Sequence, residues 1–143
     1  MTEAAEGYRK VEEFVSGWRE EVPAVKGSFK QLLAVLEALE GVACTFTARP
    51  GVSYSLRPKH YRQQNRDFFM ILDVIDDDPA ARWLSVCFHA DLITDPDGRG
   101  EVIPGGLAGS DGYCFDLYSD DLDLVAYLEK RCLEAWESAK AGR

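Results

Sequence analysis

The stretch DFFMILDVIDDDPAARWLSVCFHADL, residues 67–92, decides the fold of this chain. It holds the two most strand-like runs, residues 68–75 and 83–92, joined by an acidic turn that contains Pro79. The first run is apolar on both faces apart from Asp73, as expected of a central strand. The second alternates strictly, which predicts two faces. The core face is Leu84, Val86, Phe88, Ala90 and Leu92, and the opposite face is Trp83, Ser85, Cys87, His89 and Asp91.

Three amphipathic segments around this stretch predict helices. The first covers residues 3–21, with Val22 on its apolar side and Pro23 ending it. The second begins at Ser28, which forms a capping box with Gln31, and it stops at Gly41. The third begins at residue 120 or 121 and runs to about residue 140.

The remaining strands are expected over residues 42–49, 52–57, 101–103 and 113–117, with residues 58–65 and 94–112 as loops. Pro50 and Gly51 predict a type II turn between the first two strands. Alternation there puts Cys44, Phe46, Val52, Tyr54 and Leu56 on one face and Thr45, Thr47, Arg49, Ser53, Ser55 and Arg57 on the other. The chain is thus predicted to be a single α+β domain over residues 1–143. We expect a two-layer sandwich with a four- to five-stranded, mostly antiparallel sheet, and with two N-terminal helices and one C-terminal helix on one face.

Composition narrows the class of protein. With 143 residues, 46% of them apolar, the chain is long enough for one hydrophobic core. It has no apolar run long enough to span a bilayer and no secretory signal, so we expect a cytoplasmic protein without a membrane partner. The cysteines Cys44, Cys87, Cys114 and Cys132 are far apart and form no Cys-x-x-Cys pair, so they are predicted to be buried thiols. We predict no cofactor.

Charge is distributed unevenly. The net charge is −9, yet residues 41–66 contain no acid and five bases. An acidic chain disfavours general nucleic-acid binding, but a local positive window suits a small anionic ligand or an acidic protein partner. The alternative is a solvated loop whose bases pair with surrounding acids. Our leading hypothesis is therefore a non-catalytic binding domain that uses the polar sheet face and the basic loop 57–66. The candidate residues are Arg49, Arg57, Lys59, Arg62 and Arg66, with Trp83 as an apolar anchor.

The polar face leaves a second reading open. Cys87, His89 and Asp91 lie on one side of a predicted strand, which suggests a small metal- or thiol-dependent enzyme. On one straight strand these donors are too far apart to converge without a further group from elsewhere. A homodimer or a cover formed by residues 94–112 would also explain Trp83 on this face. An acidic antitoxin or immunity-type protein with a basic partner is a third reading.

The order of elements resembles the small YdhG-like α+β domains. The resemblance rests on the helix over residues 29–40 followed by Gly41 and Val42, on the strand VSYSLR at residues 52–57, and on FDL at residues 115–117 before the last helix. Residues 94–112 depart from the family pattern. The resemblance implies the fold and carries over no enzymatic activity.

Overall fold

The computed structural model describes residues 3–19 and 25–143. These residues confirm an α+β architecture with an antiparallel sheet, but the sheet has six strands rather than four or five. The predicted end of the first helix at Val22 and Pro23 lies outside the described residues. In chain order the elements are α1 (Glu3–Gly17), α2 (Lys26–Ala38), β1 (Val42–Arg49), β2 (Ser53–His60), β3 (Met70–Ile75), β4 (Trp83–His89), the 3₁₀ helix η1 (Ala90–Leu92), β5 (Glu101–Leu107), β6 (Ser110–Leu117) and α3 (Leu122–Lys140).

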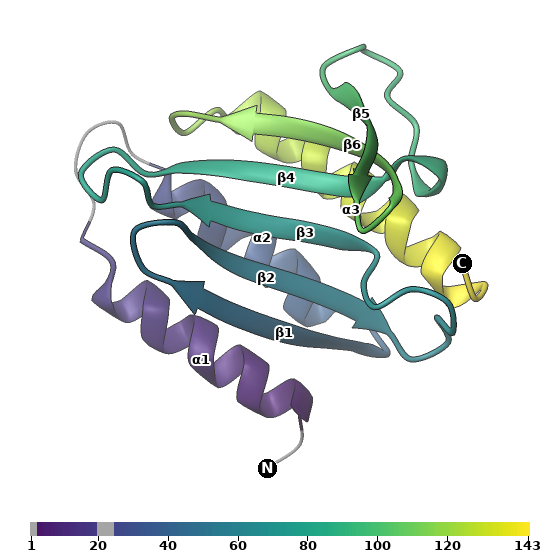
Figure 1. Cartoon of the computed structure of the whole chain (residues 1–143), viewed down its shortest axis with the longest axis horizontal. Coiled ribbons are helices and arrows are strands. Elements are labelled where there is room, and N and C mark those ends of the chain that lie inside the picture. Colours follow the sequence, from purple (N-terminus) through teal and green to yellow (C-terminus); the bar gives the residue numbers. More distant parts are fainter. Residues whose placement is uncertain (1–2, 20–24) are drawn as a thin grey trace.

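The strands are arranged in the order β1-β2-β3-β4-β6-β5, and every neighbouring pair is antiparallel. Figure 1 shows α2 and α3 behind the sheet on one face, and α1 along the edge strand β1. A Cβ added at Gly7 of α1 would overlap the carbonyl oxygen of Cys44 in β1, so glycine permits this close approach. None of the helices in the described residues combines the length and the apolarity needed to cross a membrane.

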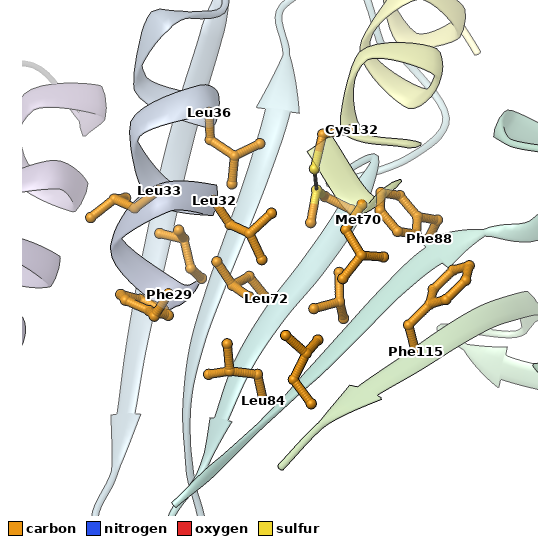
Figure 2. Close-up of a cluster of buried hydrophobic side chains, with 14 of the residues drawn as sticks. Phe29, Leu32, Leu33, Leu36, Met70, Leu72, Leu84, Phe88, Phe115 and Cys132 are labelled. Carbon is orange, nitrogen blue, oxygen red and sulfur yellow. Dashed lines mark hydrogen bonds between the residues drawn. The ribbon is translucent and has the colours of Figure 1, made fainter. Parts of the chain in front are cut away.

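The side chains between the sheet and α2 and α3 form the main core (Figure 2). Leu84, Val86 and Phe88 of β4 are fully buried there, as their alternation predicts. The strand stops at His89, however, so Ala90 and Leu92 continue in η1 and not in the predicted strand. Burying each large apolar side chain contributes about 1.5–3 kcal/mol, which makes this layer the main source of stability.

The start of α2 differs from the prediction. The helix begins at Lys26, and no side chain of its own N-cap residue, Val25, is hydrogen-bonded to it. Asp120 supplies the missing acceptor, because its carboxylate accepts the Ser28 backbone N–H at 3.0 Å and also the Ser28 hydroxyl. Asp121 caps α3 as predicted, accepting the Leu124 N–H at 3.0 Å.

The β1–β2 hairpin follows the predicted turn. Gly51 has a φ of 83°, and the Val52 N–H donates to the Arg49 carbonyl at 2.9 Å, as a type II turn requires. Val52 is 55% exposed, so its predicted place on the core face is wrong. The strand that follows continues to His60, three residues beyond its predicted end.

Residues 94–112 are more ordered than predicted. Most of the segment belongs to β5 and β6, joined by a tight turn in which Ala108 and Gly109 both have positive φ. Asp95 anchors the part before β5. Burial alone would raise the pKa of Asp95, but hydrogen bonds from Tyr127, Gly100 and Tyr113 hold it well below its usual range.

The acidic turn after β3 is anchored through one buried carboxylate. Asp76 is 2% exposed, accepts the Gly51 N–H at 2.8 Å and pairs with Arg82 Nε at 2.7 Å. The Arg82 guanidinium lies over the rings of Phe14 and Tyr54, each 5.3 Å away. This ion pair therefore ties the β1–β2 turn to α1.

Candidate functional site

The face of the sheet turned away from α2 and α3 is the open face, seen from the front in Figure 1. A row of polar side chains crosses five strands on this face, and each residue of the row is the cross-strand partner of the next. This row confirms the predicted polar face. The row is Thr47, Ser55, Asp73, Ser85 and Asp116. Other residues of the open face include Thr45, Arg49, Ser53, Arg57, Lys59, Ile71, Ile75, Trp83, Cys87, His89, Cys114, Glu101 and Ile103.

The β1–β2 side of the open face is basic. It carries Arg49, Arg57 and Lys59, three of the five predicted bases. Arg49 donates to the Ser53 hydroxyl at 3.3 Å, and Arg57 Nε donates to the Ser55 hydroxyl at 3.1 Å. None of the three bases forms a salt bridge with a described residue. The two arginines are therefore held by hydroxyl groups and not by a salt bridge with a described acid.

Asp73 lies beside the bases in the middle of the open face. Burial raises the pKa of its carboxyl, while the Ser55 hydroxyl and the positive charges of Arg57 and Arg49 oppose the shift. Its Oδ1 is buried and has no hydrogen-bond partner among the described residues. Asp73 thus marks the boundary between the basic side and the rest of the face.

Arg62 and Arg66 lie apart from this group. Arg62 stacks over the Tyr61 ring at 5.6 Å and lines a small hollow of about 110 Å³ with Trp136 of α3, on the helix side of the sheet. Arg66 pairs with Asp91 at 3.0 Å. The five predicted bases are therefore not one site.

The basic loop is held by its own polar side chains. The His60 N–H donates to Gln63 Oε1 at 3.0 Å, and Gln63 Nε2 donates to the Phe68 carbonyl at 3.2 Å. Both His60 and Gln63 are buried. The prediction of an irregular loop over residues 58–65 is wrong for residues 58–60, which belong to β2.

Trp83 lies on the open face, as predicted from the alternation of β4. Its ring is half-buried and stacks on Tyr118, with the ring centroids 5.0 Å apart. Tyr118 itself is 58% exposed. The two rings form an exposed aromatic patch at the end of the face opposite to Lys59.

Cys87, His89 and Asp91 do not converge on one point. Cys87 is joined to Cys114 by a disulfide, and His89 Nδ1 lies 2.6 Å from the Ser110 hydroxyl. Because β4 ends at His89, Asp91 falls in η1, where its carboxylate is in the ion pair described above. Within the described part of the chain, no three side chains of the His, Cys, Asp and Glu types are grouped to hold a metal ion.

His89 is buried at the end of the open face, with only 3% of its surface exposed. Burial lowers the pKa of its imidazole, and the charge of Arg66 lowers it further. Its ring stacks on Phe68 at a centroid distance of 4.9 Å. This environment favours the neutral imidazole.

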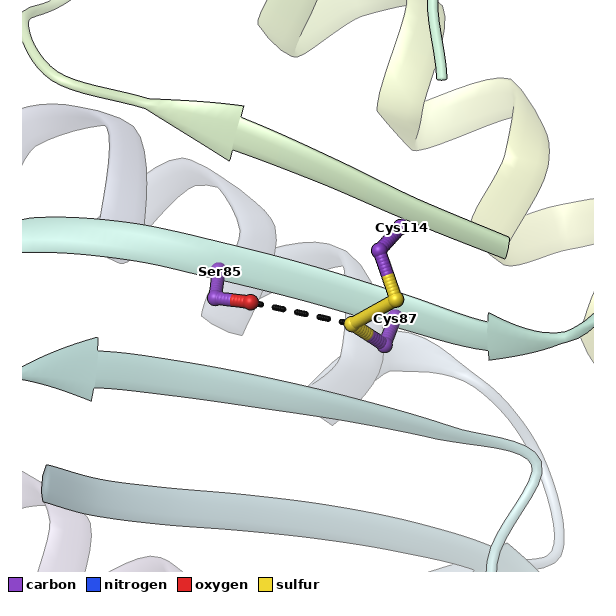
Figure 3. Close-up of a disulfide and its surroundings, with 3 residues drawn as sticks. All are labelled: Ser85, Cys87 and Cys114. Atoms are coloured by element: carbon purple, nitrogen blue, oxygen red, sulfur yellow. Dashed lines mark hydrogen bonds between the residues drawn. A yellow bond between two sulfur atoms is a disulfide. The ribbon is translucent and has the colours of Figure 1, made fainter. Parts of the chain in front are cut away.

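The four cysteines divide into two kinds. Cys44 and Cys132 are free and buried, as predicted, and burial raises the pKa of their thiols to about 11 and about 12. Cys87 and Cys114 are cross-strand partners on β4 and β6, with Cα atoms 4.2 Å apart, and they form the disulfide in Figure 3. The prediction of four thiols is wrong for this pair. Sequence spacing gave no signal for it, because the pairing depends on the register of two strands that are not consecutive.

The far end of β5 lies over the open face. Leu107 packs against Phe68 and Ile71 in a small second apolar cluster, and Cys87 packs against the same cluster. Figure 1 shows β5 crossing in front of β6 on this side. Residues 94–112 thus cover the end of the face that holds Cys87, whereas Trp83 at the other end stacks on Tyr118.

A hollow of about 450 Å³ lies on the β4–β6 side of the open face, and the disulfide is part of its lining. The two carboxylates in its lining, Asp116 and Glu101, form no salt bridge with a described residue. Burial raises the pKa of Asp116, and the negative charge of Glu101 raises it further. The open face therefore has a basic side at β1–β2 and an acidic side at β5–β6.

Comparison with known proteins finds no family model, no curated protein and no solved structure that this chain matches. The resemblance to the YdhG-like domains stays an expectation from the sequence.

Proposed function

We propose that this protein is a non-catalytic binding domain that holds an acidic segment of a partner protein on the β1–β2 side of the open face. One observation carries the proposal. Arg49, Arg57 and Lys59 lie on one surface without a salt bridge to any described residue, and hydroxyl groups accept hydrogen bonds from the two arginines, in a chain whose net charge is −9.

The spacing of the bases favours an extended partner over a single small ion. Ser53, the cross-strand partner of Arg49, is four residues from Arg57 along β2. At about 3.3 Å per residue, the backbone positions of Arg49 and Arg57 lie about 13 Å apart along the strands, and Lys59 continues the row two residues further. Carboxylates spaced along an extended acidic segment span that distance. Guanidinium groups bind carboxylates through paired hydrogen bonds, and the hydroxyls orient them for this.

The test is binding of a fluorescent peptide of alternating Glu and Ser, measured by anisotropy. The double variant Arg49→Glu/Arg57→Glu is expected to bind at least about tenfold more weakly, because each lost charged hydrogen bond is worth about 1.5–3 kcal/mol.

The matched control is Lys10→Glu/Arg62→Glu. Both residues are exposed and lie away from the open face, on α1 and beside α3, and the variant has the same net charge as the test variant. It should bind the peptide like the wild-type protein. Equal weakening in both variants would mean that only overall charge matters, and the proposal would fail.

Cys87, His89 and Asp91 each have a separate partner, so these three side chains do not form a shared metal or thiol centre.

A further inference from the structure

We propose that the disulfide on the open face is a thiol-exchange site, at which a small cationic thiol attacks Cys114 and releases Cys87. The site lies on the acidic side of the face, away from the three bases of the proposed function. Four features carry the inference: accessibility, the direction of attack, the leaving group and the surrounding charge.

The first feature is accessibility. Cys87 and Cys114 are both half-buried, and both line the hollow of about 450 Å³ on the open face. That volume is in the range that holds a small molecule. Cys44 and Cys132, in contrast, are about 99% and 100% buried with raised thiol pKa values, so neither competes for the reagent. Access and thiolate character decide which sulfur reacts.

The direction of attack distinguishes the two sulfurs. Which sulfur a thiolate attacks depends on how freely it can reach each of them. Cys87 packs against the cluster of Phe68, Ile71 and Leu107, and Ile71 of β3 is its cross-strand partner. Cys114 lies outside this cluster, and it lines the hollow beside the edge strand β5, where Glu101 is its cross-strand partner. Cys114 Sγ is therefore the sulfur that is attacked.

The leaving sulfur has a hydrogen-bond partner. When the reagent thiolate bonds to Cys114 Sγ, the disulfide breaks and its electron pair goes to Cys87 Sγ, which then takes a proton from solvent. The products are a mixed disulfide at Cys114 and a free thiol at Cys87. The Ser85 hydroxyl lies 3.6 Å from Cys87 Sγ, as Figure 3 shows, and can donate to the departing thiolate.

Charge selects the reagent. Glu101 is the cross-strand partner of Cys114, and Asp116 is two residues along the same strand face, about 6.5–7 Å away by strand rise. Arg99, the one base in the lining, pairs with Asp121 at 3.7 Å. The two carboxylates attract a thiol that carries an ammonium group and repel one that carries an acid.

The experiment compares three thiols that differ in charge: cysteamine, 2-mercaptoethanol and 2-mercaptoethanesulfonate. Each is added to the oxidised native protein, and mixed-disulfide formation is followed by mass spectrometry. Each rate is divided by the rate of the same thiol with hydroxyethyl disulfide, which removes the differences in intrinsic reactivity. Cysteamine is expected to be roughly tenfold faster than the sulfonate after this correction. Peptide mapping should find the added thiol in a mixed disulfide with Cys114.

Two sets of variants sharpen the result. Glu101→Gln/Asp116→Asn should remove the preference for the cation, while Asp123→Asn/Glu137→Gln on α3, with the same change in net charge, should keep it. Ser85→Ala should slow all three thiols to a similar extent, because it acts on the leaving group.

Four outcomes would overturn the proposal: four free thiols in the non-reduced, denatured protein, a label on Cys87, equal corrected rates, or a cation preference that survives Glu101→Gln/Asp116→Asn. None of them affects the peptide-binding test at Arg49 and Arg57, so the two proposals fail independently.

Discussion

Cysteine and phenylalanine side chains have different environments on the two faces of the sheet. On the covered face, Cys132 is a buried thiol that contacts Met70 at 3.6 Å in an apolar layer (Figure 2). On the open face, Cys87 is oxidised and lies beside a serine hydroxyl (Figure 3). The phenylalanines differ in the same way, since Phe88 belongs to the main core and Phe68 to a cluster of three buried residues.

The difference shows that the two faces depend on different forces. The covered face is stabilised by the removal of a large apolar area from water, to which each strand and helix contributes. Fewer apolar side chains are buried on the open face, where a disulfide and hydrogen bonds to hydroxyls add to the backbone ladder of the sheet. Changes on the two faces should therefore differ in size and in kind.

The largest expected effect is the loss of a core ring. Phe88→Ala should lower the free energy of unfolding by about 3–5 kcal/mol, because it leaves a cavity in the packed layer. Phe68→Ala should cost about 2 kcal/mol or less, since its ring belongs to a cluster of only three buried residues. Urea denaturation measures both. Equal losses would mean that the open face contains a second core of comparable weight.

The disulfide is expected to come next. Its two cysteines are 27 residues apart, and closing a loop of that length stabilises a folded chain by about 3.5 kcal/mol in the chain-entropy account. Denaturation of the oxidised wild-type protein and of Cys87→Ala/Cys114→Ala gives the difference. Identical midpoints would show that the bond does not hold β4 to β6.

The smallest effect concerns pH. Burial lowers the pKa of His89, so the folded state favours the neutral imidazole. The stability that this provides is complete above the unfolded pKa of about 6.5 and is lost as pH falls below it, by at most about 1.4 kcal/mol per pH unit. His89→Gln removes this dependence and leaves His60 unchanged. The stability of the wild-type protein relative to the variant should therefore fall between neutral and mildly acidic pH. A constant difference would contradict the prediction.

Alternation predicted the positions of most side chains on the two faces. The strict period of β4 assigned Leu84, Val86 and Phe88 to the core and Trp83, Ser85 and Cys87 to the open face. This inference is reliable because the side-chain period of a strand is two, so one correctly placed residue fixes its neighbours.

Contacts between distant segments could not be predicted in this way. To predict the pairing of Cys87 with Cys114, one must know the register of β4 against β6. To predict which bases lie together, one must know where β2 ends. Arg66 looked like a member of the basic group from sequence, yet it pairs with Asp91 beyond the end of β4. Local patterns carry no information about which charged residue of a remote segment will lie opposite.

The cap of α2 has a consequence for the order of folding. Its acceptor, Asp120, is 92 residues from Ser28 along the chain, just before α3. The first turn of α2 therefore stays incomplete until the last third of the chain has been added and has docked. In a nascent chain that emerges N-terminus first, the start of α2 would stay frayed over most of the synthesis. The segment with Asp120 and Asp121 would then complete the first turns of α2 and α3 together.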